Sequence, residues 1–226
     1  SELRHLRRWL DAGGSIDYLT TDHGVMLTVG APYVAPDQHK DRGMTVGQAE
    51  EELTDSFEIT HSEIPGARLG VIESLGFFEV DGPDGKHYPR TVPALPKWPF
   101  AEYLDTLLAA MKRRGLELDH FHIDFGYEGV LHDGGGEKLD FGRILGVEAC
   151  AQQRGVKAGV IINAFHDRSV EDPQPDVASR EAYEHTTRFA TEYQAAGGNA
   201  DHLVIQTWQP YPDRTGPESE SCTVLG

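Results

Sequence analysis

The chain has 226 residues, enough for one large domain or two small ones, and its 25% charged and 38% hydrophobic residues are ordinary for a soluble globular protein. Its 37 acidic and 20 basic residues give a formal net charge of −17, which argues against nucleic-acid or anionic-membrane partners because the field repels phosphates. No run of 18 apolar residues and no signal peptide is present, and the location, secreted or cytoplasmic, stays open.

Helices and strands alternate along the chain. Apolar residues at helical spacing predict helices over residues 2–12, 45–57, 99–114, 140–154 and 179–196, the second of them opening on a Thr45–Gln48 capping box. Strands are predicted at residues 16–22, 68–73, 118–126, 158–163 and 201–208, and long loops at 25–44, 82–98, 127–138 and 164–178. This alternation implies a parallel sheet with right-handed crossovers in a single domain over residues 1–226.

The predicted strand at residues 118–126 has the clearest pattern in the chain. Phe121, Ile123 and Phe125 point to one face, and His120, His122 and Asp124 point to the other. The apolar face needs a cover of helices, whereas two imidazoles and a carboxylate are costly to bury unless they are paired or used. We therefore expect the polar face to carry a functional site.

Residues 17–22, 119–124 and 201–206 of three predicted strands align without gaps, and residues 69–73 and 159–163 of the other two align with each other. Each aligned segment ends on a carboxylate or a carboxamide. These residues are Asp22, Glu73, Asp124, Asn163 and Gln206. The face that carries them is the more polar one, whereas an open doubly wound sheet needs two apolar faces. The contrast favours a (β/α)8 TIM-type barrel with a polar lumen, whose remaining strands lie in residues 25–34, in residues 77–80 or outside this chain.

Two carboxylates across a cleft are what the hydrolysis of a glycosidic bond requires. The arrangement resembles the (β/α)8-barrel glycoside hydrolases in architecture, loosely over residues 1–210 and without a family-defining motif. The resemblance implies Asp124 and Glu73 as the catalytic pair. Asp124 comes first, because His122 on the same face can tune its pKa.

A carbohydrate or another small polar substrate is the expected partner, with no metal or cofactor, and the oligomeric state is left open. The expected substrate-binding residues are Asp22, His122, Tyr127, Glu128, Asn163, His166, Gln206, Trp208 and Tyr211. Amides and imidazoles suit sugar hydroxyls, and the aromatic rings of Trp208 and Tyr211 suit the apolar face of a pyranose. Glu128 is also a substitute acid.

Two alternatives remain at this point. One is a metal-dependent barrel hydrolase or isomerase, in which His122 and Asp124 bind Zn²⁺ or Mn²⁺ and a site is completed from Asp22, His23, Glu73 and His166. The other is a barrel that binds carbohydrate without turnover. In every reading, His120 and His202 are expected to be hydrogen-bonded core histidines.

Overall fold

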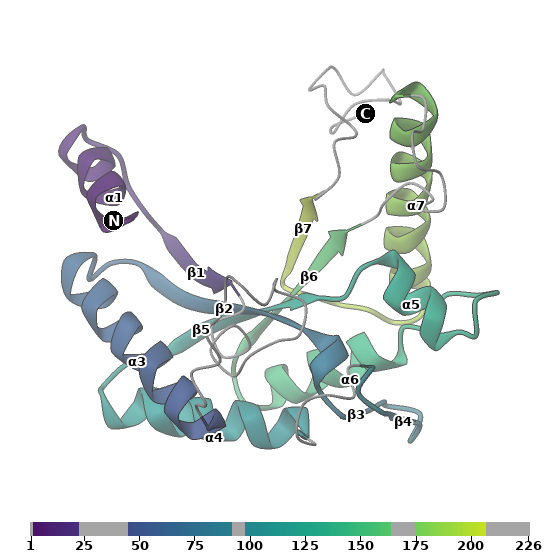
Figure 1. Cartoon of the computed structure of the whole chain (residues 1–226), viewed down its shortest axis with the longest axis horizontal. Helices are drawn as coiled ribbons and strands as arrows, with labels where there is room; N and C mark the ends of the chain where they lie inside the picture. The colour runs from purple at the N-terminus through teal and green to yellow at the C-terminus, as the bar shows by residue number, and fades with distance from the viewer. Residues whose placement is uncertain (1, 23–44, 92–97, 164–174, 207–226) are drawn as a thin grey trace.

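The computed structural model describes residues 2–22, 45–91, 98–163 and 175–206, and every structural statement refers to these residues. Five parallel strands form the main sheet: β1 (Tyr18–Asp22), β2 (Arg68–Ser74), β5 (Leu118–Asp124), β6 (Lys157–Asn163) and β7 (His202–Gln206). Their order in the sheet is their order in the chain. Figure 1 shows the sheet curled like a trough, with β1 and β7 rising at its two edges.

Six α-helices accompany the sheet within the described ranges: α1 (Glu2–Asp11), α3 (Val46–Glu63), α4 (Phe100–Arg113), α5 (Tyr127–Asp133), α6 (Gly142–Gln153) and α7 (Pro175–Ala195). Helices α3, α4 and α6 lie beneath the convex side of the trough, and α7 stands beside β6 (Figure 1). None of the described helices is long and apolar enough to cross a membrane.

The expected eight-stranded barrel is wrong. In the described residues the parallel sheet has five strands and ends at β1 and β7, which makes it a half-barrel. Residues 25–34, one place where a further strand was expected, lie outside the described residues. Residues 75–81 form the short 3-10 helix η1 (Leu75–Phe77) and the strand β3 (Val80–Asp81), which pairs with β4 (His87–Tyr88) in a separate hairpin.

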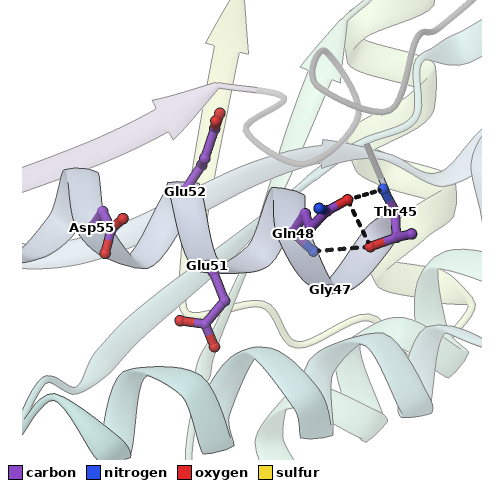
Figure 2. A pocket seen from close by; sticks show the side chains of 6 residues that line it. All are labelled: Thr45, Gly47, Gln48, Glu51, Glu52 and Asp55. Carbon is purple, nitrogen blue, oxygen red and sulfur yellow. Dashed lines mark hydrogen bonds between the residues drawn. The ribbon is translucent and has the colours of Figure 1, made fainter. Parts of the chain in front are cut away.

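Two expected loops also contain regular structure. Residues 127–133 form α5, because Tyr127 and Val130 share a face that becomes buried. Residues 82–88 form the turn and second strand of the β3–β4 hairpin, in which Gly85 takes a left-handed conformation, with φ of 80°. The capping box of α3 is confirmed: the Gln48 amide donates to Thr45 Oγ1 and Gln48 Oε1 accepts from the Thr45 amide, at 3.3 and 2.9 Å (Figure 2).

The core lies between the convex face of the sheet and the helices. Phe121 and Ile123 of β5 are fully buried there, as the alternation of that strand predicts. Val160 and Ile162 of β6 continue the same layer. At the β7 edge the layer is open within the described residues, since Leu203 and Ile205 are exposed there.

A buried arginine joins three segments next to this core. Arg143 of α6 is 1% exposed, and its Nε and Nη2 donate to the two carboxylate oxygens of Asp133 at 2.7 and 3.0 Å. The same guanidinium donates to the carbonyl oxygens of Phe78 and Pro89 at 3.3 and 3.0 Å. These bonds tie the β3–β4 hairpin region to α5 and α6.

Candidate functional site

The concave face of the sheet collects polar side chains from its strands. Register partners in parallel strands point to the same face, so the face can be followed from strand to strand. Its described members are Tyr18, Thr20, Asp22, Arg68, Gly70, Ile72, Ser74, His120, His122, Asp124, Lys157, Gly159, Ile161, His202, Val204 and Gln206. Ring contacts among Tyr18, His120, His122 and His202 confirm that β1, β5 and β7 turn these side chains toward one another.

Glu73 lies on the other face of the sheet. Its register partner on β5 is Ile123, its side chain is fully buried, and its Oε1 accepts a hydrogen bond of 3.2 Å from the Tyr103 hydroxyl of α4. Burial, together with the carboxylate of Glu73, raises the pKa of Tyr103 well above its ordinary value, so the phenol stays a donor. The structure does not bring Glu73 and Asp124 together.

Glu73 lies on the opposite face from Asp124 because of the register between β2 and β5. The sequence-based superposition matched Glu73 with Asp124 as the ends of their strands, but β2 extends one residue further and Ser74 is the partner of Asp124. A shift of one residue turns a side chain to the opposite face of a sheet. An irregularity of pairing between Leu69 and Gly70 changes the register inside this strand pair, since Leu69 pairs with Leu118 but Gly70 pairs with His120.

Asp124 ends β5, the central strand, on the concave face. Its side chain is half-buried, and its register partners are Ser74 on β2 and Ile161 on β6. Asp22, exposed at the end of β1, and Gln206, at the end of β7, share this face. Asn163 ends β6 as the register partner of Gln206.

Two further expected binding residues, Tyr127 and Glu128, belong to α5. Tyr127 is buried in the packing of α5 on α7, where its ring stacks on His185 at 4.2 Å and its hydroxyl accepts from Arg188 at 2.8 Å. Glu128 is exposed on the first turn of α5. His23, His166, Trp208 and Tyr211 lie outside the described residues.

Three histidines and a tyrosine form a cluster on the concave face. His122 Nε2 lies 3.1 Å from His202 Nδ1, and the rings of His120 and His122 have centroids 4.7 Å apart. The Tyr18 ring meets His120 and His202 edge-on, with both centroid distances at 5.6 Å. The sequence predicted core positions for His120 and His202, which both follow an aspartate at the same point of their strands, but it did not predict this cluster with His122 and Tyr18.

Two imidazoles of the cluster, those of His120 and His122, are neutral at pH 7. Burial lowers the pKa of His122 to about 4, and the neighbouring His120 and His202 act in the same direction. Burial also lowers the pKa of His120, against the opposing effect of Asp119. His120 and His122 therefore become protonated only at acidic pH.

His120 is the buried, hydrogen-bonded histidine that its position predicted. Its Nε2 lies 2.8 Å from Thr20 Oγ1, and its Nδ1 lies 3.3 Å from Asp119 Oδ2. The other oxygen of Asp119 accepts from Lys157 Nζ at 2.9 Å, so the carboxylate also joins β5 to β6. His120 thus takes part in holding β1, β5 and β6 together.

The described residues offer no arrangement for a metal ion. No group of three or more histidine, cysteine, aspartate or glutamate side chains among them is placed to hold one. A surface pocket over the first turns of α3 is acidic, lined by Glu51, Glu52 and Asp55 (Figure 2). Glu51 and Asp55 there already pair with Arg114, the residue that follows α4.

No family model matches the chain, and no curated protein matches it in sequence. The suggested likeness to (β/α)8-barrel glycoside hydrolases is therefore wrong as a statement of family, since the described fold is a five-stranded half-barrel. The chemistry of the concave face is therefore what indicates a function for this fold.

Proposed function

We propose that the protein hydrolyses glycosidic bonds of a carbohydrate bound on the concave face, at the C-terminal ends of the strands. The observation that carries the proposal is Asp124, a half-buried carboxyl at the end of the central strand on the face not covered by helices α3, α4 and α6. Ligands of parallel α/β sheets bind beyond the carboxyl ends of the strands. Partial burial is also what suits a carboxyl to general acid work.

Asp22 is the second carboxylate of the proposed site, in place of Glu73. It shares the concave face with Asp124 and lies two strands away, on β1. Asp22 is level with His122, so two strand spacings and two residues along the strands separate its backbone from that of Asp124, a distance of about 12 Å. The curl of the sheet turns the two side chains toward each other and shortens this distance between the carboxyl groups, so the pair suits inversion, for which carboxyl groups stand roughly 6.5–9.5 Å apart. Asp124 donates its proton to the leaving oxygen, and Asp22 accepts one from the attacking water.

The amide of Gln206 and the imidazole of His122 supply hydrogen bonds to sugar hydroxyls in this proposal. His122 is neutral at pH 7, since its pKa is about 4, so it offers a donor or an acceptor without adding positive charge beside Asp124. A neutral, hydroxyl-rich ligand fits a face whose carboxyl end carries Asp22 and Asp124.

Asp124→Asn is expected to remove hydrolysis while leaving the fold intact. Loss of a general acid costs roughly 10²–10⁴-fold in kcat, and the amide preserves the shape of a half-buried side chain. Release of reducing ends from a panel of neutral oligosaccharides measures turnover, and urea unfolding measures stability. Asp22→Asn is expected to give a comparable loss.

Glu117→Gln is the matched control, because it removes an exposed carboxylate just before the other end of the same strand. It is expected to keep wild-type turnover. Wild-type turnover in Asp124→Asn would overturn the proposal. Measurable sugar binding by the wild type with no hydrolysis of any oligosaccharide would leave a carbohydrate-binding protein instead of an enzyme.

A further inference from the structure

The first edge strand is tied to the centre of the sheet across a glycine. Thr20, Gly70 and His120 are register partners on β1, β2 and β5. The imidazole lies directly over Gly70, where an added Cβ would come within 2.0 Å of His120 Nε2. The missing side chain of β2 therefore lets His120 reach the hydroxyl of Thr20, 2.8 Å away on the next strand.

The other edge strand is tied in the same way. His122, Gly159 and His202 are register partners on β5, β6 and β7. An added Cβ at Gly159 would come within 2.3 Å of His122 Cδ2, so this ring also lies over a glycine. It reaches His202 on the far side, with a distance of 3.1 Å between His122 Nε2 and His202 Nδ1.

Tyr18 closes the arrangement across the trough. It belongs to β1, yet its ring contacts His202 of β7 as well as His120 of β5. Contacts between the first and the last strand of a five-stranded sheet require the sheet to curl. The same side chains therefore connect the centre of the sheet to both edges and the edges to each other.

We propose that Tyr18, His120, His122 and His202 form a clamp that maintains the curl of the sheet and releases the edge strands β1 and β7 when its imidazoles gain protons. The bond between His122 and His202 needs one nitrogen as an acceptor, and two cationic rings have none to offer. Protonated rings at 4.7 Å would also repel each other. The clamp does not depend on the proposed hydrolysis.

The charged and titratable groups around the clamp do not cancel this effect. They are Asp22 on β1, Arg68 on β2, Asp119 and Asp124 on β5, and Lys157 on β6. Asp119 favours a proton on His120, but it is shared with Lys157 Nζ at 2.9 Å. Arg68 donates to the hydroxyl of Tyr18 at 2.8 Å and adds positive charge at the N-terminal end of the face.

The sign of the pH dependence follows from the lowered pKa values of His120 and His122. The unfolded or released chain binds protons near pH 6.5, whereas the clamped form resists them until about pH 4 for His122. The clamp therefore stabilises the clamped form fully above about pH 6.5, and this stabilisation is lost as the pH falls toward 4.

Amide hydrogen exchange at pH 7 and pH 5, corrected for intrinsic rates, tests the clamp. In the wild type, we expect amides of β1 and β7 to lose protection by about tenfold or more at pH 5, while β5 keeps its protection. In His122→Gln, whose amide can reach His202 but cannot take a proton, the loss at β7 is expected to shrink to within about twofold. His5→Gln, which replaces an exposed histidine of α1, is expected to behave as the wild type.

Two results would overturn the clamp. One is loss of protection in β1, β5 and β7 together, which would indicate global unfolding. The other is a wild-type pH response at β7 in His122→Gln. If that variant fails to fold at pH 7, His202→Asn tests the same contact from β7. A smaller loss of amide protection at β7 between pH 7 and pH 5 would then support the clamp, and an unchanged loss would contradict it.

Discussion

Gly70→Ala is expected to destabilise the protein by roughly 2–5 kcal/mol, the sum of an overpacked interior and a lost buried hydrogen bond. The new methyl group would stand 2.0 Å from Nε2 of His120. That ring is fully buried and cannot swing into solvent, so either β2 shifts or the bond to Thr20 breaks. Urea unfolding followed by circular dichroism gives the change in the free energy of unfolding.

The double variant with His120→Ala separates this mechanism from a general intolerance of β2. Without the imidazole, the methyl group at residue 70 has room, and the added cost of Gly70→Ala is expected to fall below about 1 kcal/mol. Gly47→Ala is the control glycine: nothing lies within 4 Å of its Cβ position and it sits in α3, so alanine is expected to be neutral or stabilising. If Gly70→Ala lowers the free energy of unfolding equally with and without His120, a clash between the new methyl group and the imidazole is ruled out.

Local patterns in the sequence predicted local structure well. The alternation along β5 identified the buried face with Phe121 and Ile123, and the spacing of Thr45 and Gln48 identified the start of α3. The alternation of helices with strands predicted a parallel sheet, which the strand pairing confirms. These features depend on neighbours in the chain, which a sequence displays directly.

The number of strands and their register were not predictable in the same way. A polar and an apolar face suggested a closed lumen, but a curled open sheet with helices on its convex side produces the same contrast. Glu73 shares its parity along β2 with Leu69 and Val71, two residues of the buried core. Their apolarity was a signal that Glu73 faces the helices.

The histidine cluster depends on pairs that only the folded sheet creates. Gly70 and Gly159 are unremarkable in the sequence, and they matter because register places them beneath His120 and His122. Asp124, which the sequence suggested as a catalytic residue, remains part of the candidate site. Its second carboxylate changes to Asp22, because the strand register places Asp22 on the face of Asp124 and Glu73 on the opposite face.

Arg143→Met is expected to cost roughly 3–5 kcal/mol of unfolding free energy, the range found when one partner of a buried ion pair is removed. Asp133, only 6% exposed at its side chain, would keep a charge without the guanidinium that now donates to both of its oxygens. The carbonyl oxygens of Phe78 and Pro89 would lose their donors as well. Urea unfolding of the variant and the wild type at pH 7 measures the difference.

Arg154→Met is the matched control, because Arg154 makes a similar two-pronged contact to Asp105 at the surface. Exposed ion pairs contribute about 0–1 kcal/mol, so this variant is expected to stay within about 1 kcal/mol of the wild type. Asp133→Asn in the Arg143→Met background is expected to recover part of the loss, since the remaining side chain is then neutral. A cost for Arg143→Met no larger than that for Arg154→Met would mean that the β3–β4 hairpin region is held by its apolar contacts, with the buried ion pair contributing little.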